Sequence, residues 1–235
     1  MINKYVEIFT QELEVIMQGN EKPKGAILQR DGKTYAIVPR IPGGLAKLEN
    51  LKEIVNVVEK YNIPIIKITS GHRLALVGMS GDVIDNIWKD LKMDTGKATE
   101  LCLHYVQACP GNIVCKFGVQ DSLGLGIEIE EFFLGTVLPA KVKIGVSGCQ
   151  LCCGESFVRD IGIMAKKKGW TVIVGGNSAR RPRIGDIIAE DISKGEVVSL
   201  TKRCLEYYAA NGRVKERTAR FIDRIGIDEF KKSVL

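Results

Sequence analysis

Long hydrophobic runs are missing from this chain. No apolar stretch approaches the roughly 20 residues that a membrane-spanning helix needs, so we expect no membrane partner. The N-terminal residues carry Glu7 inside their apolar run and lack a small-residue cleavage site, which argues against a signal peptide. We therefore expect a cytoplasmic protein, in which thiols stay reduced and disulfides do not form.

Aromatic residues are also scarce, at 6% of the sequence, and they do not alternate with the basic residues. Proteins that bind single-stranded nucleic acid combine the two, so we expect no nucleic acid partner. The basic residues are instead concentrated between Arg159 and Arg183, where seven of them accompany one acid, Asp160. This basic stretch is either a solvated face or a site for an anionic ligand.

The rest of the composition is ordinary for a globular protein, with 45% hydrophobic and 26% charged residues. A chain of 235 residues is long enough for two modest domains. We expect an N-terminal helix within residues 1–20, a first domain over 21–95 and a second domain over 96–235.

The first domain is predicted to belong to the α+β class. Short runs of apolar and branched residues predict strands over 26–29, 35–38, 65–69 and 74–78. Apolar positions that recur at three and four predict helices over 48–61 and 83–91. This order of elements is typical of helices packed on one face of a mainly antiparallel sheet.

The second domain is predicted to begin with a strand over 101–108 that leads into Cys109. Its other expected elements are a helix ending at Phe133, a strand over 141–147, a hairpin over 161–174 and two helices over 196–210 and 214–233. Side chains alternate along a strand, so Lys141 and Lys143 should point to the same face.

Five of the seven cysteines lie in two tight groups: Cys109 and Cys115, then Cys149, Cys152 and Cys153. Four thiolates are the number that an iron–sulfur cluster requires. Structural zinc sites usually separate paired cysteines by two to four residues, which the first group does not. The spacing therefore favours a cluster, and it leaves open whether Cys152 takes part.

The other two cysteines, Cys102 and Cys204, lie in apolar stretches and are typical of buried structural thiols. A polar corner over residues 69–73 joins two of the predicted strands and ends with His72 and Arg73. It is either a solvated hairpin tip or an anion contact.

The segment Ala108-Cys-Pro-Gly-Asn-Ile-Val-Cys-Lys-Phe-Gly-Val-Gln-Asp-Ser122, followed by Leu-Pro-x-Lys-x-Lys and Ser-Gly-Cys-x3-Cys, resembles the sirohaem-dependent nitrite and sulfite reductase family. The resemblance is strongest over residues 100–190. It implies a ferredoxin-like half-domain followed by an α/β domain that holds a sirohaem joined to a four-iron four-sulfur cluster. Many members carry two copies of this unit, whereas this chain carries one.

The resemblance implies metal ligands and cofactor contacts. The cluster ligands would be Cys109, Cys115, Cys149 and Cys153, and Cys153 would also bridge to the sirohaem iron. Asn177, Arg180, Arg181 and Arg183 would lie beside the carboxylates of the sirohaem, which need cationic partners.

The resemblance also implies the groups that handle substrate. Arg73, Lys141 and Lys143 would bind the anion and neutralise the charge that accumulates as its oxygens leave. Where the family usually has an arginine before the first cluster cysteine, this chain offers His104. We list His104 as a candidate proton donor, with a vacant position as the alternative.

The implied activity is the six-electron reduction of sulfite to sulfide or of nitrite to ammonia. No Gly-x-Gly-x-x-Gly fingerprint follows a predicted strand, so electrons should come from a separate low-potential donor such as a ferredoxin. Two other classes of protein stay open: an iron–sulfur electron-transfer or accessory protein without reductase activity, and a zinc-stabilised regulatory domain.

A homodimer is also expected. Lys143 precedes Cys149 by up to about 20 Å of extended strand. That separation is awkward for reaching the far face of a haem held by Cys153 of the same chain. Lysines of one chain should therefore face the sirohaem of the other.

Overall fold

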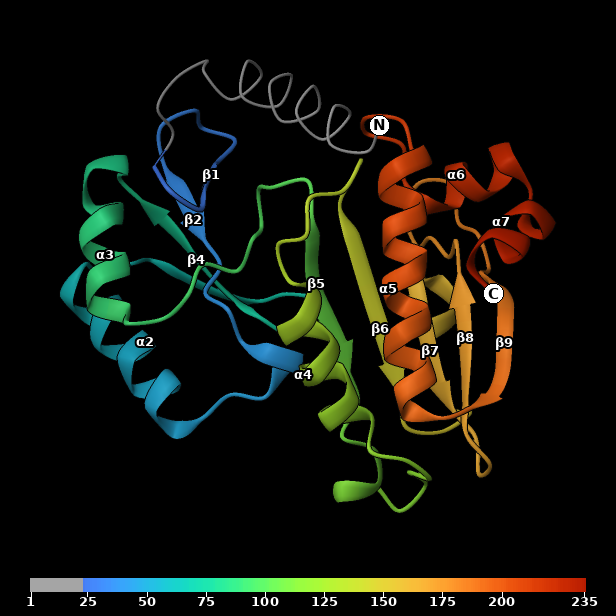
Figure 1. The fold of residues 1–235 in the computed structure, drawn as a ribbon. Coiled ribbons are helices and arrows are strands. Elements are labelled where there is room, and N and C mark those ends of the chain that lie inside the picture. The colour runs from blue at the N-terminus through green and yellow to red at the C-terminus, as the bar shows by residue number, and fades with distance from the viewer. Residues whose placement is uncertain (1–22) are drawn as a thin grey trace.

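The computed structural model describes residues 23–235, so the helix expected within residues 1–20 lies outside the described residues. Two sheets organise the chain (Figure 1). Among the described residues, no helix is long and apolar enough to cross a membrane.

The first sheet has the strand order β1-β2-β4-β3, and every neighbouring pair is antiparallel. Its strands are β1 (Ala26–Leu28), β2 (Tyr35–Ile37), β3 (Ile65–Ile68) and β4 (Leu74–Met79). Helices α2 (Leu48–Lys60) and α3 (Ile84–Leu91) pack against it through apolar side chains such as Ile54 and Ile87. Short 3-10 turns η1 (Pro42–Gly44) and η2 (Gly81–Val83) lead toward these helices. The α+β arrangement expected for this part of the chain is confirmed.

The second sheet has the order β5-β6-β7-β8-β9. Its strands are β5 (Leu103–Ala108), β6 (Val142–Ser147), β7 (Ile161–Ala165), β8 (Trp170–Val174) and β9 (Asp186–Ile192). The pairs β5–β6 and β6–β7 are parallel, whereas β7–β8 and β8–β9 are antiparallel. The hairpin expected over 161–174 is therefore present, and β9 is an edge strand that the sequence did not predict.

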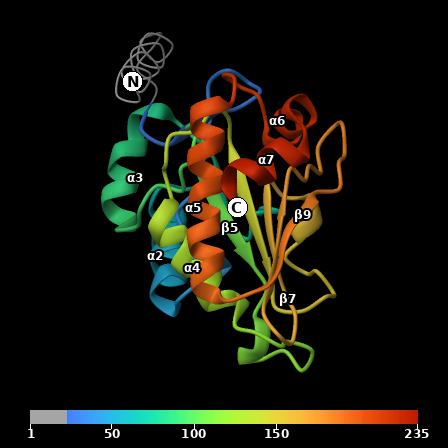
Figure 2. The same cartoon turned by 45° about the vertical axis from the view of Figure 1, so that its right-hand side comes forward.

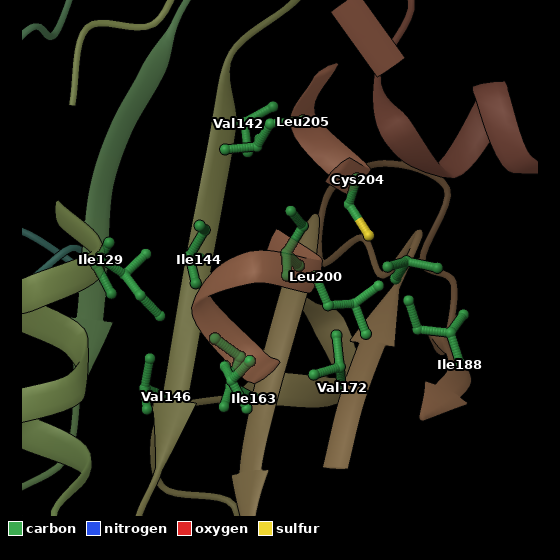
Figure 3. Close-up of a cluster of buried hydrophobic side chains, with 14 of the residues drawn as sticks. Ile129, Val142, Ile144, Val146, Ile163, Val172, Ile188, Leu200, Cys204 and Leu205 are labelled. Atoms are coloured by element: carbon green, nitrogen blue, oxygen red, sulfur yellow. The ribbon is translucent and has the colours of Figure 1, made fainter. Parts of the chain in front are cut away.

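One face of this sheet is covered by helices α4 (Ser122–Phe133), α5 (Lys194–Asn211), α6 (Thr218–Ile225) and α7 (Ile227–Val234) (Figures 1 and 2). Strand residues such as Val142, Ile144 and Val146 point toward them and meet Leu200 and Leu205 of α5 (Figure 3). Two 3-10 turns, η3 (Gly111–Ile113) and η4 (Ser156–Val158), lie in the loops after β5 and β6. The opposite face of the sheet is left for polar side chains and loops.

The helix expected over 214–233 is wrong as a single element. It is two short helices, α6 and α7, that meet at Gly226. Gly226 has a φ of 87°, which lies outside the helical region and favours glycine. The apolar spacing runs on across the break because both helices bury side chains, such as Phe221 and Phe230, in the same core.

The buried carboxylate of Glu130 joins the two sheets. From α4, it accepts hydrogen bonds from the Val106 backbone in β5 and from the Gly43 backbone in η1, each at 3.3 Å. It also pairs with Arg40 at 3.0 Å. A buried carboxylate is costly unless it is fully bonded, so these contacts fix η1 against the second sheet.

Candidate functional site

The functional residues gather on the face of the second sheet that the helices leave uncovered. Along β6, Val142, Ile144 and Val146 belong to the core, so Lys143 between them points to the other side. Tyr105 and Gln107 of β5 are buried but do not belong to the hydrophobic cluster under the helices.

The two cysteine loops meet because β5 and β6 are parallel neighbours. Ala108 is opposite Val146 in the sheet, so the chain leaves both strands at the same edge. Cys109 follows β5 directly and donates its backbone N–H to Val146 at 3.1 Å. Cys149 follows β6 after one intervening glycine. Carboxyl ends of adjacent parallel strands therefore place the two groups of cysteines side by side.

Backbone contacts hold these loops together. The Val119 N–H donates to the Gly148 carbonyl at 2.8 Å, and the Gly148 N–H points at the Cys109 sulfur at 3.1 Å. A side chain on Gly148 would place its Cβ within 2.6 Å of the Gly111 Cα, so only glycine permits this approach.

The sulfurs of both loops lie near one another. Desolvation raises the pKa of the Cys153 thiol, and the neighbouring thiols of Cys109, Cys149, Cys115 and Cys152 raise it further. All five cysteines are free, and Cys153 is the exposed one. Within residues 23–235, no three His, Cys, Asp or Glu side chains are gathered closely enough to hold a single metal ion. An iron–sulfur cluster takes its thiolates at separate iron atoms and does not require that closeness.

The remaining two cysteines are buried, as the sequence predicts. Burial raises the pKa of the Cys102 thiol to about 11 and that of the Cys204 thiol to about 12. Both therefore stay protonated near neutral pH and pack as small apolar groups.

The segment from Cys153 to Asp160 lies flat on the polar face of the sheet. Gly145 of β6 leaves room for it, because a Cβ there would come within 2.8 Å of the Arg159 side chain. The Ser147 hydroxyl bonds the Ser156 hydroxyl at 2.8 Å and accepts from the Gly154 N–H at 3.0 Å. These bonds fix the segment that follows Cys153.

A cavity of about 280 Å³ opens beside this segment. Its lining residues come from five separate parts of the chain: Ser70, Lys143, Glu155, Val158, Arg159, Asp160, Asn177, Ser178, Ala179 and Arg217. Three of these residues are cations, namely Lys143, Arg159 and Arg217, and only Lys143 belongs to a motif in the sequence. Its Nζ lies 5.7 Å from the centre of the Tyr105 ring, and burial lowers its pKa, with Arg217 and Arg159 adding to the effect.

Asp160 organises the wall of the cavity. Although it is 1% exposed, it accepts hydrogen bonds from the Lys143 backbone at 2.9 Å, from Thr218 at 2.6 Å and from both Nε and Nη2 of Arg217. The sequence signals Arg159 and Asp160 only as part of the basic stretch. Nothing in it indicates that Arg217 lies beside them.

Arg73 directly precedes β4 and is buried, so the interpretation of residue 73 as part of a solvated tip is wrong; His72 is exposed. The Arg73 guanidinium lies 4.9 Å from the Tyr105 ring centre and donates to the Gly96 carbonyl. Burial lowers its pKa, and its Nε has no hydrogen-bond partner in the described part of the chain.

His104 and Lys141 are held by backbone carbonyls. The His104 Nε2 lies 2.6 Å from the Glu100 carbonyl, which can only accept, so Nε2 carries the proton. Burial lowers the pKa of His104 to about 4, which leaves the imidazole neutral near pH 7. Lys141 precedes β6, and its Nζ donates to the Ala98 carbonyl at 3.1 Å.

The loop after β8 carries the predicted sirohaem contacts. Asn177 lines the cavity and donates to the Arg181 carbonyl at 2.7 Å. Arg180 and Arg181 are exposed. Arg183 is half-buried and pairs with Asp223 of α6 at 2.8 Å and with Asp186 of β9 at 2.7 Å.

The basic stretch between Arg159 and Arg183 does not form one solvated face. Arg159 is buried in the cavity wall, and Lys166 pairs with Glu190 of β9. Only Lys167, Lys168, Arg180 and Arg181 are exposed.

Both sheets match models of one family. Residues 101–235 match the nitrite and sulphite reductase 4Fe-4S domain, and residues 27–94 match the nitrite/sulfite reductase ferredoxin-like half domain. The chain therefore belongs to the nitrite and sulfite reductase family, as the cysteine and lysine motifs predict.

Individual relatives also belong to the sulfite and nitrite reductases. An assimilatory-type sulfite reductase of Nitratidesulfovibrio vulgaris is 53% identical over 216 residues, which are 92% of this chain and 99% of that protein. A nitrite reductase [NAD(P)H] of Bacillus subtilis is 39% identical over 202 residues, 86% of this chain but 25% of that protein. The fold is similar to the Mycobacterium tuberculosis NirA protein, with a TM-score of 0.76 at 19% identity over 92% of this chain and 43% of that one.

The cofactors of the family are a four-iron four-sulfur cluster and sirohaem, and the residues present fit both. Four thiols converge from two loops whose backbones are already fixed. The cavity that Lys143, Arg159 and Arg217 line begins at Glu155, two residues after the exposed Cys153, and a macrocycle with many carboxylates needs such cations.

Proposed function

We propose that the chain reduces sulfite to sulfide or nitrite to ammonia, with electrons from a separate low-potential donor. The observation that carries this proposal is that the cysteine loops lie at the carboxyl ends of β5 and β6 and that a cationic cavity lies beside the segment that follows them, with Glu155 of the cavity two residues from Cys153. The names of its relatives support both substrates.

When bound, the sirohaem and the cluster supply the electron transfer and the redox chemistry. Cys109, Cys115, Cys149 and Cys153 are the proposed ligands of the cluster, and Cys153 is also the proposed link to the sirohaem iron. The cationic side chains of this chain bind the oxyanion and stabilise negative charge on its oxygens.

Lys143 is the strongest candidate for binding substrate, because its ammonium is half-buried and has no ion-pair partner in the described part of the chain. Lys141 and Arg73 lie close enough to His104 to affect its pKa, so they extend the cationic region toward β4. His104 is a less suitable candidate for the proton donor, because with a pKa of about 4 almost none of its imidazole carries the extra proton at neutral pH.

The visible spectrum of the anaerobically purified protein tests the cofactors. Sirohaem bands should accompany the absorption of the cluster, whereas an accessory iron–sulfur protein would show the cluster alone. Elemental analysis should find iron, and zinc in its place would refute the cluster assignment. Assays of both anions with reduced methyl viologen then decide between sulfite and nitrite.

Lys143→Ala should lose most of its turnover and keep both cofactors. Lys167→Ala, which removes an exposed lysine of the β7–β8 turn, is the matched control and should behave as wild type. Full activity of Lys143→Ala would remove Lys143 from the site.

We also propose that two copies of the chain act together, so that the lysines of one face the sirohaem of the other. Light scattering of the active holoprotein should give the mass of a dimer. A fully active monomer would refute this arrangement. The low-potential donor and the cytoplasmic location expected from the sequence stay predictions.

A further inference from the structure

The loops that carry the cysteines also carry apolar side chains that the described part of the chain leaves uncovered. Ile113, Val114 and Phe117 belong to the loop after β5, and Leu151 belongs to the loop after β6; each is more than half exposed. All four lie within two residues of a proposed cluster ligand. Neither the core of the second sheet nor the cavity includes them. Large apolar side chains that gather at a surface in this way mark a site for a partner.

The sheet brings a lysine-rich turn to the same place. Strands β5, β6 and β7 are parallel, so the loops that follow them leave the sheet at one edge. The β7–β8 turn is one of these loops, and the Gln120 side chain of the first loop donates to its Lys166 carbonyl at 3.3 Å. Both loops lie at the lower end of the view in Figure 1. Three loops from separate parts of the chain therefore share one end of the sheet.

Two exposed lysines at this end have no ion-pair partner among the described residues. The Lys116 Nζ lies 4.9 Å from the centre of the Phe117 ring, so a cation and an exposed aromatic ring are presented together. Lys168 is exposed in the β7–β8 turn. A positive rim around apolar side chains favours an acidic partner.

The acids close to these lysines are already engaged. Asp121 accepts the Gly124 N–H at the start of α4, where the helix dipole offsets its charge. Glu190 pairs with Lys166 and raises the pKa of that lysine, and Asp191 adds to the effect. The positive charges of the other two lysines are therefore left for a partner.

We propose that this end of the sheet docks a small acidic electron-carrier protein. The docking surface consists of a centre and a rim, which are Ile113, Val114, Phe117 and Leu151 for the centre and Lys116 and Lys168 for the rim. Protein interfaces combine an apolar and aromatic centre with a polar rim, and opposite charges speed the encounter. The inference rests on the proposed function, which needs electrons from a separate donor.

The position of the docking surface selects an electron carrier among acidic partners. Electron transfer slows steeply with distance, so a donor has to dock where the proposed cluster ligands come close to the surface. Val114 directly precedes Cys115, and Leu151 lies midway between Cys149 and Cys153. Each docked donor gives up one electron: its own redox centre is oxidised, and the holoprotein is reduced by that electron.

The test uses Val114→Ser and Lys116→Glu in the full chain with its cofactors. Both side chains are exposed, so neither substitution opens the core. Leu48→Ser and Lys52→Glu are the matched controls. They change an exposed apolar side chain and an exposed lysine on α2, a helix of the first sheet that carries no proposed ligand.

Turnover is measured with two donors, an acidic bacterial ferredoxin and reduced methyl viologen, a small dye that needs no docking surface. Val114→Ser and Lys116→Glu should each raise the KM for ferredoxin about fivefold to tenfold, because each removes one contact of the interface. Their turnover with methyl viologen should match that of wild type. Calorimetry of the oxidised holoprotein with oxidised ferredoxin measures docking without turnover and should show the same loss of affinity.

Three results would overturn the docking surface. The first is ferredoxin affinity in Val114→Ser and Lys116→Glu that equals that of the two α2 variants, or wild type that does not bind ferredoxin at all. The second is a lower ratio of sirohaem to iron in the two loop variants, because their side chains would then cover the cofactor. The third is a dimer that dissociates in the loop variants alone, which would assign the surface to a second copy of the chain.

Failure of the proposed function gives a different result. A wild-type protein that binds ferredoxin through these side chains but reduces neither anion with methyl viologen would refute the proposed function. The docking surface would still stand, because calorimetry measures it without turnover.

Discussion

Replacing Gly145 with alanine should displace the segment that carries Cys153 and Arg159. The new Cβ would lie 2.8 Å from the Arg159 Cγ and would also collide with the carbonyl oxygen of Gly154. That oxygen belongs to the backbone and cannot rotate away. The bonds of Ser147 to Gly154 and Ser156 hold the segment against the sheet, so the collision must appear as strain or as movement.

Overpacking of this kind costs about 1–3 kcal/mol. For a chain of this size, each kcal/mol lowers the melting temperature by about 2–4 °C, so we expect a fall of about 2–12 °C. The ratio of sirohaem to iron should fall as well, because the displaced segment includes Cys153. Differential scanning calorimetry and the visible spectrum of the holoprotein measure the two effects.

Gly195 provides the matched control. It lies in the first turn of α5, and a Cβ built there meets no atom within 4 Å. Gly195→Ala should leave the melting temperature unchanged or raise it, since alanine favours a helix by up to about 1 kcal/mol. The close packing of the segment on β6 would be refuted if Gly145→Ala melted no lower than wild type and kept its sirohaem.

Two further substitutions test buried polar groups. Burial lowers the pKa of His104 to about 4, so protonation of this side chain is less favourable in the folded state than in the unfolded state. The free energy of unfolding should therefore be highest above about pH 6.5 and fall by about 2–3 kcal/mol between pH 6.5 and pH 4.5. Denaturant midpoints at the two pH values should show a smaller fall in His104→Gln, and an equal fall would contradict the shift. Asp160→Asn should cost about 2–3 kcal/mol, less than a fully buried pair, because Arg217 is 31% exposed and water can reach it; an unchanged urea midpoint would show that this carboxylate does not anchor α6.

Local patterns in the sequence predicted most of the fold. Alternation and helical spacing are local properties, and they located the strands of the first sheet and four strands of the second. They did not locate β9, whose sequence Asp186–Ile192 mixes acids with apolar residues as an edge strand does. The break at Gly226 was missed because the apolar spacing continues through it.

The site was predictable only where its residues are close in sequence. The cysteine pairs and the Lys-x-Lys run stand out in the sequence, and their motif indicated the family that the comparisons show. Arg217 lies 57 residues from the Asp160 that it contacts, so no local pattern could reveal it. Arg183 stays a predicted sirohaem contact, and no local pattern indicated its ion pairs with Asp186 of β9 and Asp223 of α6.

Hydrogen bonds join the backbones of the two cysteine loops, from Cys109 to Val146 and from Val119 to Gly148. Fixing a residue in one backbone conformation costs about 1–2 kcal/mol of conformational entropy. The residues of the cysteine loops are already ordered by these hydrogen bonds, so a bound cluster would not have to order them again. A cluster bound by the four proposed cysteines would therefore cross-link two segments that are far apart in sequence but that backbone hydrogen bonds already join.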